Sequence, residues 1–436
     1  MPVATIEAVD LEGRGVIHID GRTVFVDGAL PGEEVEYSIY RERPSYALAR
    51  LERVIRPSAQ RVEPKCPWFG TCGGCSMQHL DSTAQAAIKQ RVLEDELWNV
   101  GKLRAETIFP PIHGPSWGYR YRARIGARLV PKKGGVLVGF RERKSSYIAD
   151  MTSCEILPPH VSEMLPRLRE LIGGLSRPDR IPQIELAIGD NDVTVLVFRH
   201  LEPLTEADEA RLIAFSDAHG VQVWTQSKGP DTVQRLHPKE APGLSYTLPE
   251  FNVRMDFHPT DFTQVNVAIN RLLMRRAMQL LDPQPGERVG DLFCGLGNFS
   301  LPIARSGATV VGVEGSEGLV ARASENARAN GLAEHSEFHA ANLFEVTEDS
   351  LAALGPFDKM LIDPPRDGAI AVIKGLSARQ LPQRIVYVSC NPSTLARDAA
   401  VLVHEKGYVL RGAGIANMFP QTSHVESIAV FEQAGI

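Results

Sequence analysis

The sequence lacks long hydrophobic runs and has few cysteines. No stretch of 18 or more apolar residues occurs in the 436 positions, so no segment has the composition of a membrane-spanning helix. The first residues, MPVATIEAVDLEGRG, contain neither a cationic start nor an apolar core, which argues against a secretory signal. We therefore expect a cytoplasmic protein without membrane contact. Disulfides are rare in that compartment, so the six cysteines indicate metal binding or catalysis.

An overall excess of positive charge is also missing, although one segment is strongly basic. The formal net charge is −6, which does not by itself indicate a nucleic-acid-binding protein. Between residues 104 and 144, however, there are ten basic residues and only two acidic ones. Within this segment YRYRARIGARLV alternates with period two and predicts a strand with one cationic face, on which Tyr119 and Tyr121 accompany the arginines. Two interpretations stay open: a solvated surface strand, or a phosphate-binding face whose tyrosines stack on bases.

The length predicts several domains, because a single hydrophobic core stops growing at about 250–300 residues. Residues 1–60 read as strands, with a hairpin turn at Asp20-Gly21, and predict a small β-barrel. Residues 61–245 are mixed and hold the basic strands and a cysteine cluster. They also contain a predicted helix over 82–99, with Ser82 and Gln85 as its capping box, which we expect to pack on the third part.

The third part, residues 246–436, alternates strands with helical stretches. The strands ERVGDLF, ATVVGVE, DKMLID and RIVYVSC are separated by such stretches, which is typical of a parallel sheet. Two further strands, YVLRGAGIANM and HVESIAVFE, follow without a helix between them. The order predicts an α/β fold with a doubly wound sheet that ends in an antiparallel hairpin.

A glycine turn after the first of these strands indicates a nucleotide-like ligand. In DLFCGLGNFS, Gly295 and Gly297 allow a tight turn and a close approach of the backbone to a ligand. Glu314 ends the next strand, 23 positions after Asp291, where a carboxylate can accept hydrogen bonds from ribose hydroxyls. The third glycine of the dinucleotide fingerprint is missing, since Ser300 stands there, and this favours S-adenosylmethionine over NAD. A plain strand–helix turn is the alternative.

The motif DPPR at residues 363–366 follows a later strand. Many methyltransferases that modify exocyclic amines carry an aromatic residue after the paired prolines, where it stacks on the target base. This sequence has Arg366 at that position, which argues against amine methylation. A turn that Asp363 merely caps is the alternative interpretation.

A thiol and a carboxylate complete the candidate site. Cys390 follows a strand at the edge where open α/β sheets bind their ligands. A thiolate there can add to carbon 6 of uracil and make carbon 5 nucleophilic towards a methyl group. The adduct must then lose its carbon-5 proton to a base, for which Glu426 in the final hairpin is the candidate. An inert buried thiol and an exposed edge glutamate are the alternatives, and we expect Cys294 to be a packing residue.

These motifs together resemble the RNA 5-methyluridine (uracil-5) methyltransferases. FTQVN at 262–266, DLFCGLGNFS, DPPR, SCNPSTLARD and HVES stand in that family's order, over nearly the whole chain. The resemblance implies a Rossmann-like class I S-adenosylmethionine methyltransferase domain with Cys390 as nucleophile and Glu426 as base. It also implies a set of residues that bind the methyl donor: Gln264, Phe293, Asn298, Glu314, Asn342 and Asp363. GRGV and FVDGALPGE near the start resemble a TRAM domain, an RNA-binding barrel.

Three of the six cysteines lie in the stretch CPWFGTCGGC, which indicates a metal site. Their spacing alone does not distinguish an iron–sulfur cluster from zinc, because four thiolates suit both. The resemblance implies a [4Fe-4S] cluster, held in one branch of the family by cysteines that match this sequence at Cys66, Cys72, Cys75 and Cys154. The cluster would connect two parts of the central domain, in a structural or RNA-contacting role.

A TRAM domain together with such a cluster is similar to the bacterial branch that methylates uridine 1939 of 23S ribosomal RNA. The expected partner is therefore RNA, most of all 23S rRNA, and the expected state is a monomer. Another rRNA site or a tRNA stays open as the target. A non-catalytic RNA-binding protein would not need both Cys390 and Glu426, and a cytosine-5 methyltransferase usually has Pro before its cysteine, where this chain has Ser389.

Overall fold

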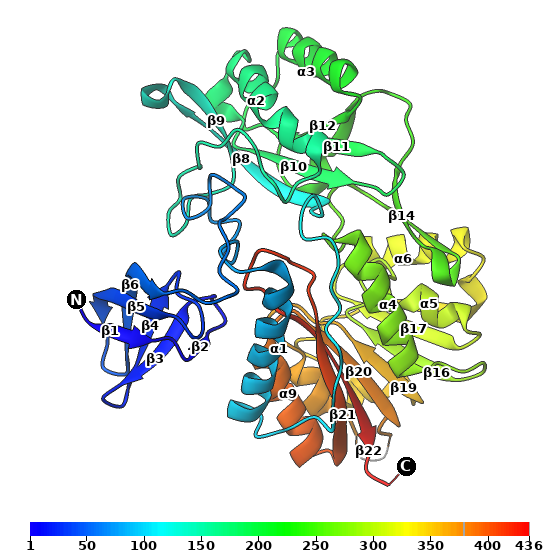
Figure 1. Ribbon diagram of the computed structural model, residues 1–436. Helices are drawn as coiled ribbons and strands as arrows, with labels where there is room; N and C mark the ends of the chain where they lie inside the picture. Colours follow the sequence, from blue (N-terminus) through cyan, green and yellow to red (C-terminus); the bar gives the residue numbers. More distant parts are fainter. Residues whose placement is uncertain (378–379, 436) are drawn as a thin grey trace.

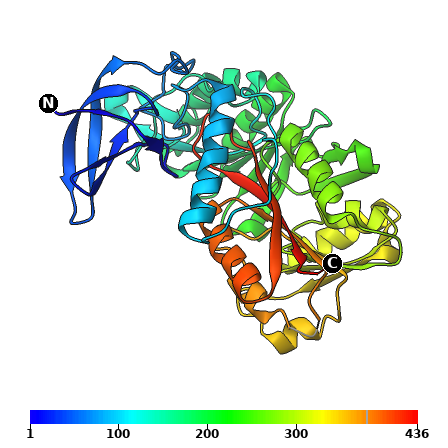
Figure 2. The same cartoon turned by 60° about the horizontal axis from the view of Figure 1, so that its bottom comes forward.

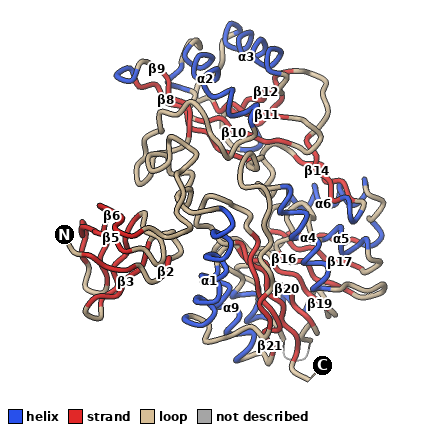
Figure 3. The backbone as a smooth tube through the Cα atoms, in the orientation of Figure 1, coloured by secondary structure: helices blue, strands red, loops and turns tan. Residues whose placement is uncertain are grey.

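The computed structural model describes residues 1–377 and 380–435, which form four sheets. Figure 1 shows an N-terminal sheet on the left, a central sheet with two helices at the top, and a large sheet flanked by helices below. Figure 3 shows that much of the chain between the N-terminal sheet and helix α1 is loop. Within the described residues, no helix is both long and apolar enough to cross a membrane.

The N-terminal sheet has six strands in the order β1-β5-β6-β4-β3-β2. Asp20 and Gly21 turn the chain between β3 and β4 with φ values of 50° and 75°, so the predicted hairpin is confirmed. Ile17, Val26 and Val35 are buried in a core that belongs to this sheet alone. The strands are Val3–Thr5 (β1), Ala8–Val9 (β2), Gly15–Ile19 (β3), Arg22–Asp27 (β4), Glu34–Glu42 (β5) and Tyr46–Arg56 (β6).

Ion pairs attach this sheet to the segments that follow it. The carboxylate of Glu33 is fully buried and accepts hydrogen bonds from Arg61 at 2.5 and 2.7 Å. Burial raises the pKa of Glu33, but the hydrogen bonds from Arg61 and the backbone outweigh burial and hold it below its ordinary value. The carboxylate of Asp27 forms ion pairs with Arg143 at 3.2 Å and Lys144 at 2.7 Å, both from the central part of the chain. The N-terminal sheet is thus held by charge as well as by packing.

The central sheet also has six strands, in the order β13-β12-β11-β10-β8-β9. Helices α2 (Pro159–Gly173) and α3 (Glu206–His219) lie on its outer side (Figure 1). The strands are Arg122–Val130 (β8), Gly135–Gly139 (β9), Gln183–Ile188 (β10), Thr194–Arg199 (β11), Gln222–Gln226 (β12) and Val233–His237 (β13).

Strand β8 is the predicted basic strand, and its predicted alternation of inward-facing and outward-facing side chains is confirmed. Ile125 is fully buried, whereas the side chains of Arg124 and Arg128 on the opposite face are exposed. Arg124 makes a surface ion pair with Glu185 at 3.2 Å. Such exposed pairs are weak, so Arg124 stays available to a stronger anionic partner.

The cationic face is narrower than the sequence predicts, because the first residues of the predicted alternation are buried or half-buried. Tyr119 is buried and donates a hydrogen bond to the carbonyl of Pro420 at 2.8 Å, so its expected role in base stacking is wrong. Tyr121 is half-buried immediately before β8. Arg122 is half-buried and donates to the carbonyl of Pro259 at 2.5 Å. Tertiary hydrogen bonds to Pro420 and Pro259 therefore take Tyr119 and Arg122 out of the expected surface.

Helix α1 (Ser82–Asn99) has the predicted bounds, but its cap is different. Asp81 is the N-cap residue and accepts a hydrogen bond from the backbone N–H of Thr83 at 2.9 Å. The expected capping box of Ser82 and Gln85 is therefore wrong. Gln85 is fully buried and uses its side-chain amide for tertiary contacts, donating to the carbonyl of Leu80 and to the side chain of Gln421 at 3.0 Å each.

Helix α1 lies along the last part of the chain, as Figure 2 shows. It contacts helix α9 (Pro392–His404) and strand β21 (Tyr408–Ala416). Leu93 and Leu97 are buried in the core that these elements share. A helix distant in sequence therefore covers part of the large sheet, as expected.

The large sheet has eight strands in the order β18-β17-β16-β19-β20-β22-β21-β7. Strands β16 to β20 are parallel, and β22 pairs antiparallel with β20 and β21, which confirms the predicted final hairpin. The remaining strands are Thr107–Ile108 (β7), Arg288–Leu292 (β16), Thr309–Glu314 (β17), Ser336–Ala340 (β18), Lys359–Ile362 (β19), Arg384–Ser389 (β20) and Glu426–Gln433 (β22). The remaining helices are Val267–Leu281 (α4), Ser300–Arg305 (α5), Glu317–Ala329 (α6), Glu348–Ala352 (α7) and Ile370–Gly375 (α8).

Three features of this region differ from the sequence analysis. Strand β18, with the sequence SEFHA, is polar and was not predicted. Strand β7 belongs to the large sheet although residues 61–245 were assigned to the central part, because Thr107 and Ile108 pair with β21. The expected boundary after residue 245 falls inside β14 (Leu244–Leu248), which pairs with β15 (Val253–Phe257) as a separate hairpin.

Candidate functional site

The candidate site residues gather at one edge of the large sheet. Parallel strands place their carboxyl ends at the same edge. Phe293 follows β16, Glu314 ends β17, Asn342 follows β18, Asp363 follows β19 and Cys390 follows β20. Strand β22 runs in the opposite direction, so its first residue, Glu426, lies at this edge as well.

The strand register places Cys390 and Glu426 next to each other. Ser389 of β20 is paired with Ser427 of β22, so the next residue on each strand, Cys390 and Glu426, is level across the two strands. Glu426 is 3% exposed, whereas Cys390 is partly exposed. The site therefore pairs an accessible thiol with a buried carboxylate.

Burial, with a smaller effect of neighbouring charges, controls the protonation of Cys390, Glu426 and Asp363. Burial raises the pKa of the Cys390 thiol to about 12, and the carboxylates of Glu426 and Asp363 contribute to the shift, while Arg366 opposes it. Burial, together with the charge of Asp363, raises the pKa of Glu426 well above its ordinary value. Burial also raises the pKa of Asp363 to about 7. A carboxyl group such as that of Asp363 can hold or release a proton near neutral pH.

The glycine turn after β16 has the geometry that its sequence predicts. Phe293, Gly295 and Gly297 have positive φ values of 64°, 56° and 95°. The N–H of Gly295 donates to the carboxylate of Glu314 at 3.1 Å, which connects the turn to the end of β17. The backbone here is fixed in a conformation that glycine adopts most easily and that leaves space near the turn.

Asp291 lies beneath this turn and is fully buried. Its Oδ2 accepts a hydrogen bond from Ser300, the residue that replaces the third glycine, at 2.5 Å. Its Oδ1 is buried without a protein partner among the described residues. Burial raises the pKa of Asp291 to about 7, with contributions from Asp363 and Glu314 and with opposition from Ser300. Cys294, beside it in sequence, is 3% exposed and has its Sγ close to Gly312, as a packing residue would.

A polar cluster holds the amide of Asn298. Its Oδ1 accepts hydrogen bonds from the hydroxyl of Tyr246 at 2.8 Å and from Asn270 at 3.2 Å, and its Nδ2 donates to Asn270 at 3.1 Å. Gln264 lines a small cavity together with Tyr246 and Asn270. Asn298 and Gln264 are among the predicted site residues, whereas Tyr246 and Asn270 are not, since no motif marks them.

Asn342 is exposed and lies apart from this cluster. Its side chain accepts a hydrogen bond from the N–H of Phe344 at 3.1 Å, and Phe344 packs near Phe293 with ring centroids 5.6 Å apart. Strand pairing between Glu314 and Ala340 places Asn342 near the acidic end of β17. Its position at the edge comes from β18, the strand that sequence reasoning missed.

Cys390 opens into a cleft of about 450 Å³ between several parts of the chain. Basic side chains line it, and one of them, Arg366, lies within 3.1 Å of the imidazole of His424. Arg143 and Lys144 line the same cleft, and so does Cys75 of the cysteine cluster. Arg143, Lys144 and His424 were not among the predicted site residues, although the first two lie in the basic segment and His424 in the quoted motif HVES.

The segment between β21 and β22, residues 417–425, is held by distant parts of the chain. We call it the 417–425 connection. The N–H groups of Ser76 and Met77 donate to the carbonyl of Gln421 at 2.9 and 3.0 Å. From α1, Lys89 donates to the side chain of Asn417 at 2.7 Å and to the carbonyl of Phe419 at 2.9 Å. These contacts fix the backbone that leads into Glu426.

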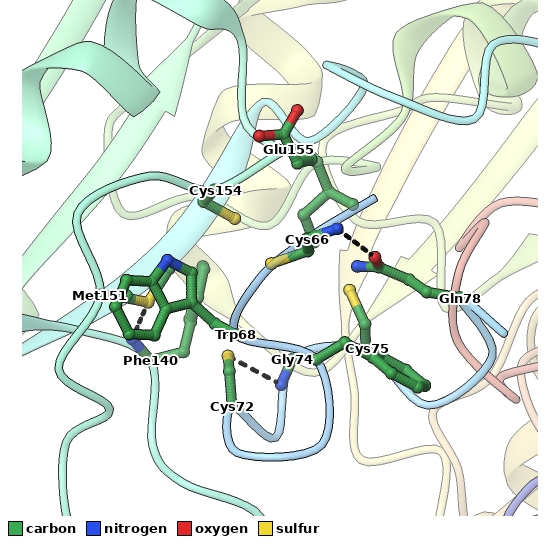
Figure 4. A pocket seen from close by; sticks show the side chains of 12 residues that line it. Cys66, Trp68, Cys72, Gly74, Cys75, Gln78, Phe140, Met151, Cys154 and Glu155 are labelled. Atoms are coloured by element: carbon green, nitrogen blue, oxygen red, sulfur yellow. Dashed lines mark hydrogen bonds between the residues drawn. The ribbon is translucent and has the colours of Figure 1, made fainter. Parts of the chain in front are cut away.

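The four cysteines of the predicted cluster meet at one cavity. Cys66, Cys72, Cys75 and Cys154 line it, and Figure 4 shows their sulfur atoms directed towards a common space. The N–H of Gly74 donates to the sulfur of Cys72 at 3.4 Å. Burial raises the pKa of all four thiols, to about 12 for Cys75 and about 11 for Cys154. Among the residues that the structure describes, no three or more His, Cys, Asp or Glu side chains are arranged closely enough to bind a single metal ion.

Comparison with known proteins identifies the family. Residues 247–434 match the family model described as tRNA (Uracil-5-)-methyltransferase. The chain is 75% identical over 433 residues to a 23S rRNA (uracil(1939)-C(5))-methyltransferase RlmD of Aromatoleum aromaticum, covering 99% of this chain and 100% of the relative. The chain belongs to the S-adenosylmethionine-dependent RNA uracil-C5 methyltransferase family.

Two other members of this family are similar over the whole chain. A protein of the same name from an Azoarcus species is 68% identical over 433 residues, covering 99% of this chain and 100% of that protein. The crystal structure of the Pyrococcus abyssi tRNA (uracil-54, C5)-methyltransferase in complex with S-adenosyl-L-homocysteine is 25% identical, with a TM-score of 0.74, and covers 99% of this chain and 100% of that chain. The Rossmann-like α/β fold expected for a methyltransferase is thereby confirmed.

The reactivity of Cys390 tests the electrostatics of the site independently of any substrate. Because the carboxylate of Glu426 raises the pKa of the thiol, Glu426→Gln should lower that pKa and increase the thiolate fraction at pH 8. We expect iodoacetamide to alkylate Cys390 faster in this variant, as measured by mass spectrometry of the peptide that contains it. Glu405→Gln, at the exposed end of α9, is the control and should leave the rate unchanged. A rate that is unchanged or slower in Glu426→Gln would contradict the assignment.

Proposed function

We propose that the chain transfers a methyl group from S-adenosylmethionine to carbon 5 of uridine 1939 in 23S ribosomal RNA. The observation that carries the chemistry is the pairing of Cys390 with the buried Glu426 across β20 and β22. The target is supported by relatives of that name at 75% and 68% identity, which are far more similar than the tRNA enzyme at 25%. An enzyme acting on ribosomal RNA would work in the cytoplasm, where ribosomes are assembled.

RNA would enter through the cleft that contains Cys390. Its basic side chains Arg143, Lys144 and Arg366 can neutralise phosphates. Leu11 and Glu12 of the N-terminal part line the same cleft, so the N-terminal sheet, in the role of a TRAM domain, would contact the same RNA. The exposed Arg124 on β8 would extend this contact to the central sheet.

The methyl donor would bind along the edge formed by β16, β17, β18 and β19. The positive-φ turn at Gly295 and Gly297 leaves space for a ligand, and Asp291 has a buried acceptor oxygen without a protein partner. Both observations fit a bound molecule with amino and hydroxyl donors. S-Adenosylmethionine supplies an electrophilic methyl group on a sulfonium that leaves easily. The residues proposed to hold it are Gln264, Phe293, Asn298, Glu314, Asn342 and Asp363.

Cys390 would begin the reaction by adding to carbon 6 of the flipped-out uracil. Its thiol proton passes to a neighbouring carboxylate, for which Asp363 is suited because its pKa is about 7. The new sulfur–carbon bond moves the electron pair of the carbon 5–carbon 6 double bond into an enolate. Carbon 5 then attacks the methyl group.

Glu426 would complete the reaction by removing the proton from carbon 5. The electron pair of that carbon–hydrogen bond restores the double bond, and the sulfur of Cys390 leaves as a thiolate. A buried carboxylate whose pKa is well above its ordinary value is a strong base in this setting. Burial also excludes water, which could otherwise protonate the enolate.

The four-cysteine cavity is proposed to hold a [4Fe-4S] cluster. Four cysteines whose sulfur atoms face a common space are the ligand set that such a cluster requires, and their pattern resembles the family branch that holds one. The hydrogen bond from Gly74 to Cys72 is typical of the backbone around iron–sulfur ligands. The cluster would connect residues 66–75 to Cys154 and so stabilise the segment that holds the 417–425 connection.

Two variants test the proposed reaction on a 23S RNA fragment. Cys390→Ala should bind RNA and S-adenosylmethionine but transfer no methyl group. Glu426→Gln should add the thiol and transfer the methyl group but fail to release the RNA, because the carbon-5 proton stays in place. We expect an RNA–protein adduct that survives a denaturing gel and carries label from the donor's methyl group.

The same two variants can also contradict the proposed mechanism. If Glu426→Gln turns over at the wild-type rate without an adduct, Glu426 is not the base. If Cys390→Ala still methylates the RNA, the covalent mechanism is wrong. Glu405→Gln should behave as wild type in both assays.

Metal analysis tests the cysteine site. Protein purified without oxygen should contain about four iron atoms and four sulfides per chain. Cys154→Ala should lose most of the iron, whereas Cys294→Ala, which changes a buried cysteine outside the cavity, should retain it. One zinc per chain with no sulfide would exclude the cluster.

A further inference from the structure

His424 lines the catalytic cleft, but the proposed reaction does not use it. It lies in the 417–425 connection, two residues before Glu426, and lines the same cleft as Cys390. The residue is accessible from the cleft, and its ring packs near Phe419 on one side with centroids 5.4 Å apart. A polar group at this place can reach a base that enters the cleft.

The hydrogen bond between His424 and Arg366 defines the form of the imidazole. Nη2 of Arg366 lies 3.1 Å from Nδ1 of His424. A guanidinium has only donors, so Nδ1 must be the acceptor and carries no proton. The remaining proton is therefore on Nε2, and the ring is neutral. Within the described part of the chain no protein group accepts a hydrogen bond from Nε2, so this donor is available to a ligand in the cleft.

Positive charge around His424 maintains this neutral form. Burial lowers the pKa of His424 to about 4, and Arg366, Lys89 and Arg120 contribute to the shift. Lys89 comes from α1 and is 1% exposed, while Arg366 comes from the loop after β19. The imidazole is thus a neutral donor in a positive environment. A neutral histidine of this kind can polarise a carbonyl without giving up its proton.

We propose that His424 is a further catalytic residue, whose Nε2–H donates a hydrogen bond to the oxygen on carbon 4 of the target uracil. This rests on the proposed function. When the sulfur of Cys390 bonds to carbon 6, the electron pair of the ring double bond moves towards carbon 4, and its oxygen becomes an enolate. A donor placed beforehand at that oxygen stabilises the charge as it forms. Arg366 supports the imidazole through Nδ1 and adds positive charge behind it.

Covalent capture on an RNA fragment with 5-fluorouridine at the target position isolates this step. Fluorine cannot leave as a proton, so each enzyme stops at the adduct and its rate reports thiol addition and methyl transfer only. With saturating S-adenosylmethionine, His424→Leu should form the adduct about 100-fold more slowly than wild type. RNA affinity measured with the unmodified fragment should change less than threefold. His424→Gln, which retains an N–H donor of similar reach, should form the adduct at least tenfold faster than His424→Leu.

A matched control separates this role from folding. His335 is exposed and precedes β18, at the opposite edge of the large sheet, and His335→Leu should form the adduct at the wild-type rate. The proposal is overturned if His424→Leu forms the adduct at the wild-type rate. It is also overturned if His424→Gln forms the adduct as slowly as His424→Leu. A loss of RNA affinity as large as the loss of rate would make His424 an RNA-binding residue instead. If wild-type enzyme forms no adduct, the proposed function itself fails, and the inference fails with it.

Discussion

The hydrogen bonds that hold the 417–425 connection are the constraint on which the site depends. Glu426 can face Cys390 only if the strand before it enters β22 in the observed register. That entry is fixed by Ser76 and Met77 from the cysteine segment and by Lys89 from α1. Burial lowers the pKa of Lys89 to about 7, so the amine can stay in this position with little cost near neutral pH. The chain that follows the cysteine segment and α1 thus both hold the segment that leads into Glu426.

In the proposed reaction, each step has a group whose protonation suits it. Burial keeps the thiol, Asp363 and Glu426 from ionising together, which places protons near the reacting atoms before the substrate arrives. Arg366 faces this negative group from the cleft and also bonds to His424. In the proposed complex, RNA phosphates and a cationic sulfonium would add charge at the same place.

Local patterns in the sequence predicted local structure well. The hairpin at Asp20-Gly21, the bounds of α1 and the antiparallel end of the large sheet follow from turn residues and periodicity that the tertiary structure preserves. The predicted cap of α1 was wrong because the side chain of Gln85 makes tertiary hydrogen bonds with Gln421, 336 positions away. The prediction that Tyr119 lies on the exposed face was wrong for the same reason, since its hydroxyl donates a hydrogen bond to the carbonyl of Pro420. Motifs found Cys390 and Glu426, but the roles of Lys89 and Asn270 depend on contacts that no sequence period encodes.

The central claim is that this chain makes 5-methyluridine at position 1939 of 23S ribosomal RNA through Cys390. The most direct measurement is mass spectrometry of that RNA from a bacterial strain without its own enzyme for this site, supplied with the wild-type chain or with Cys390→Ala. The account predicts a methyl group on uridine 1939 with the wild-type chain and none with Cys390→Ala. Full methylation with Cys390→Ala, or a methyl group that appears only at another uridine, would contradict it.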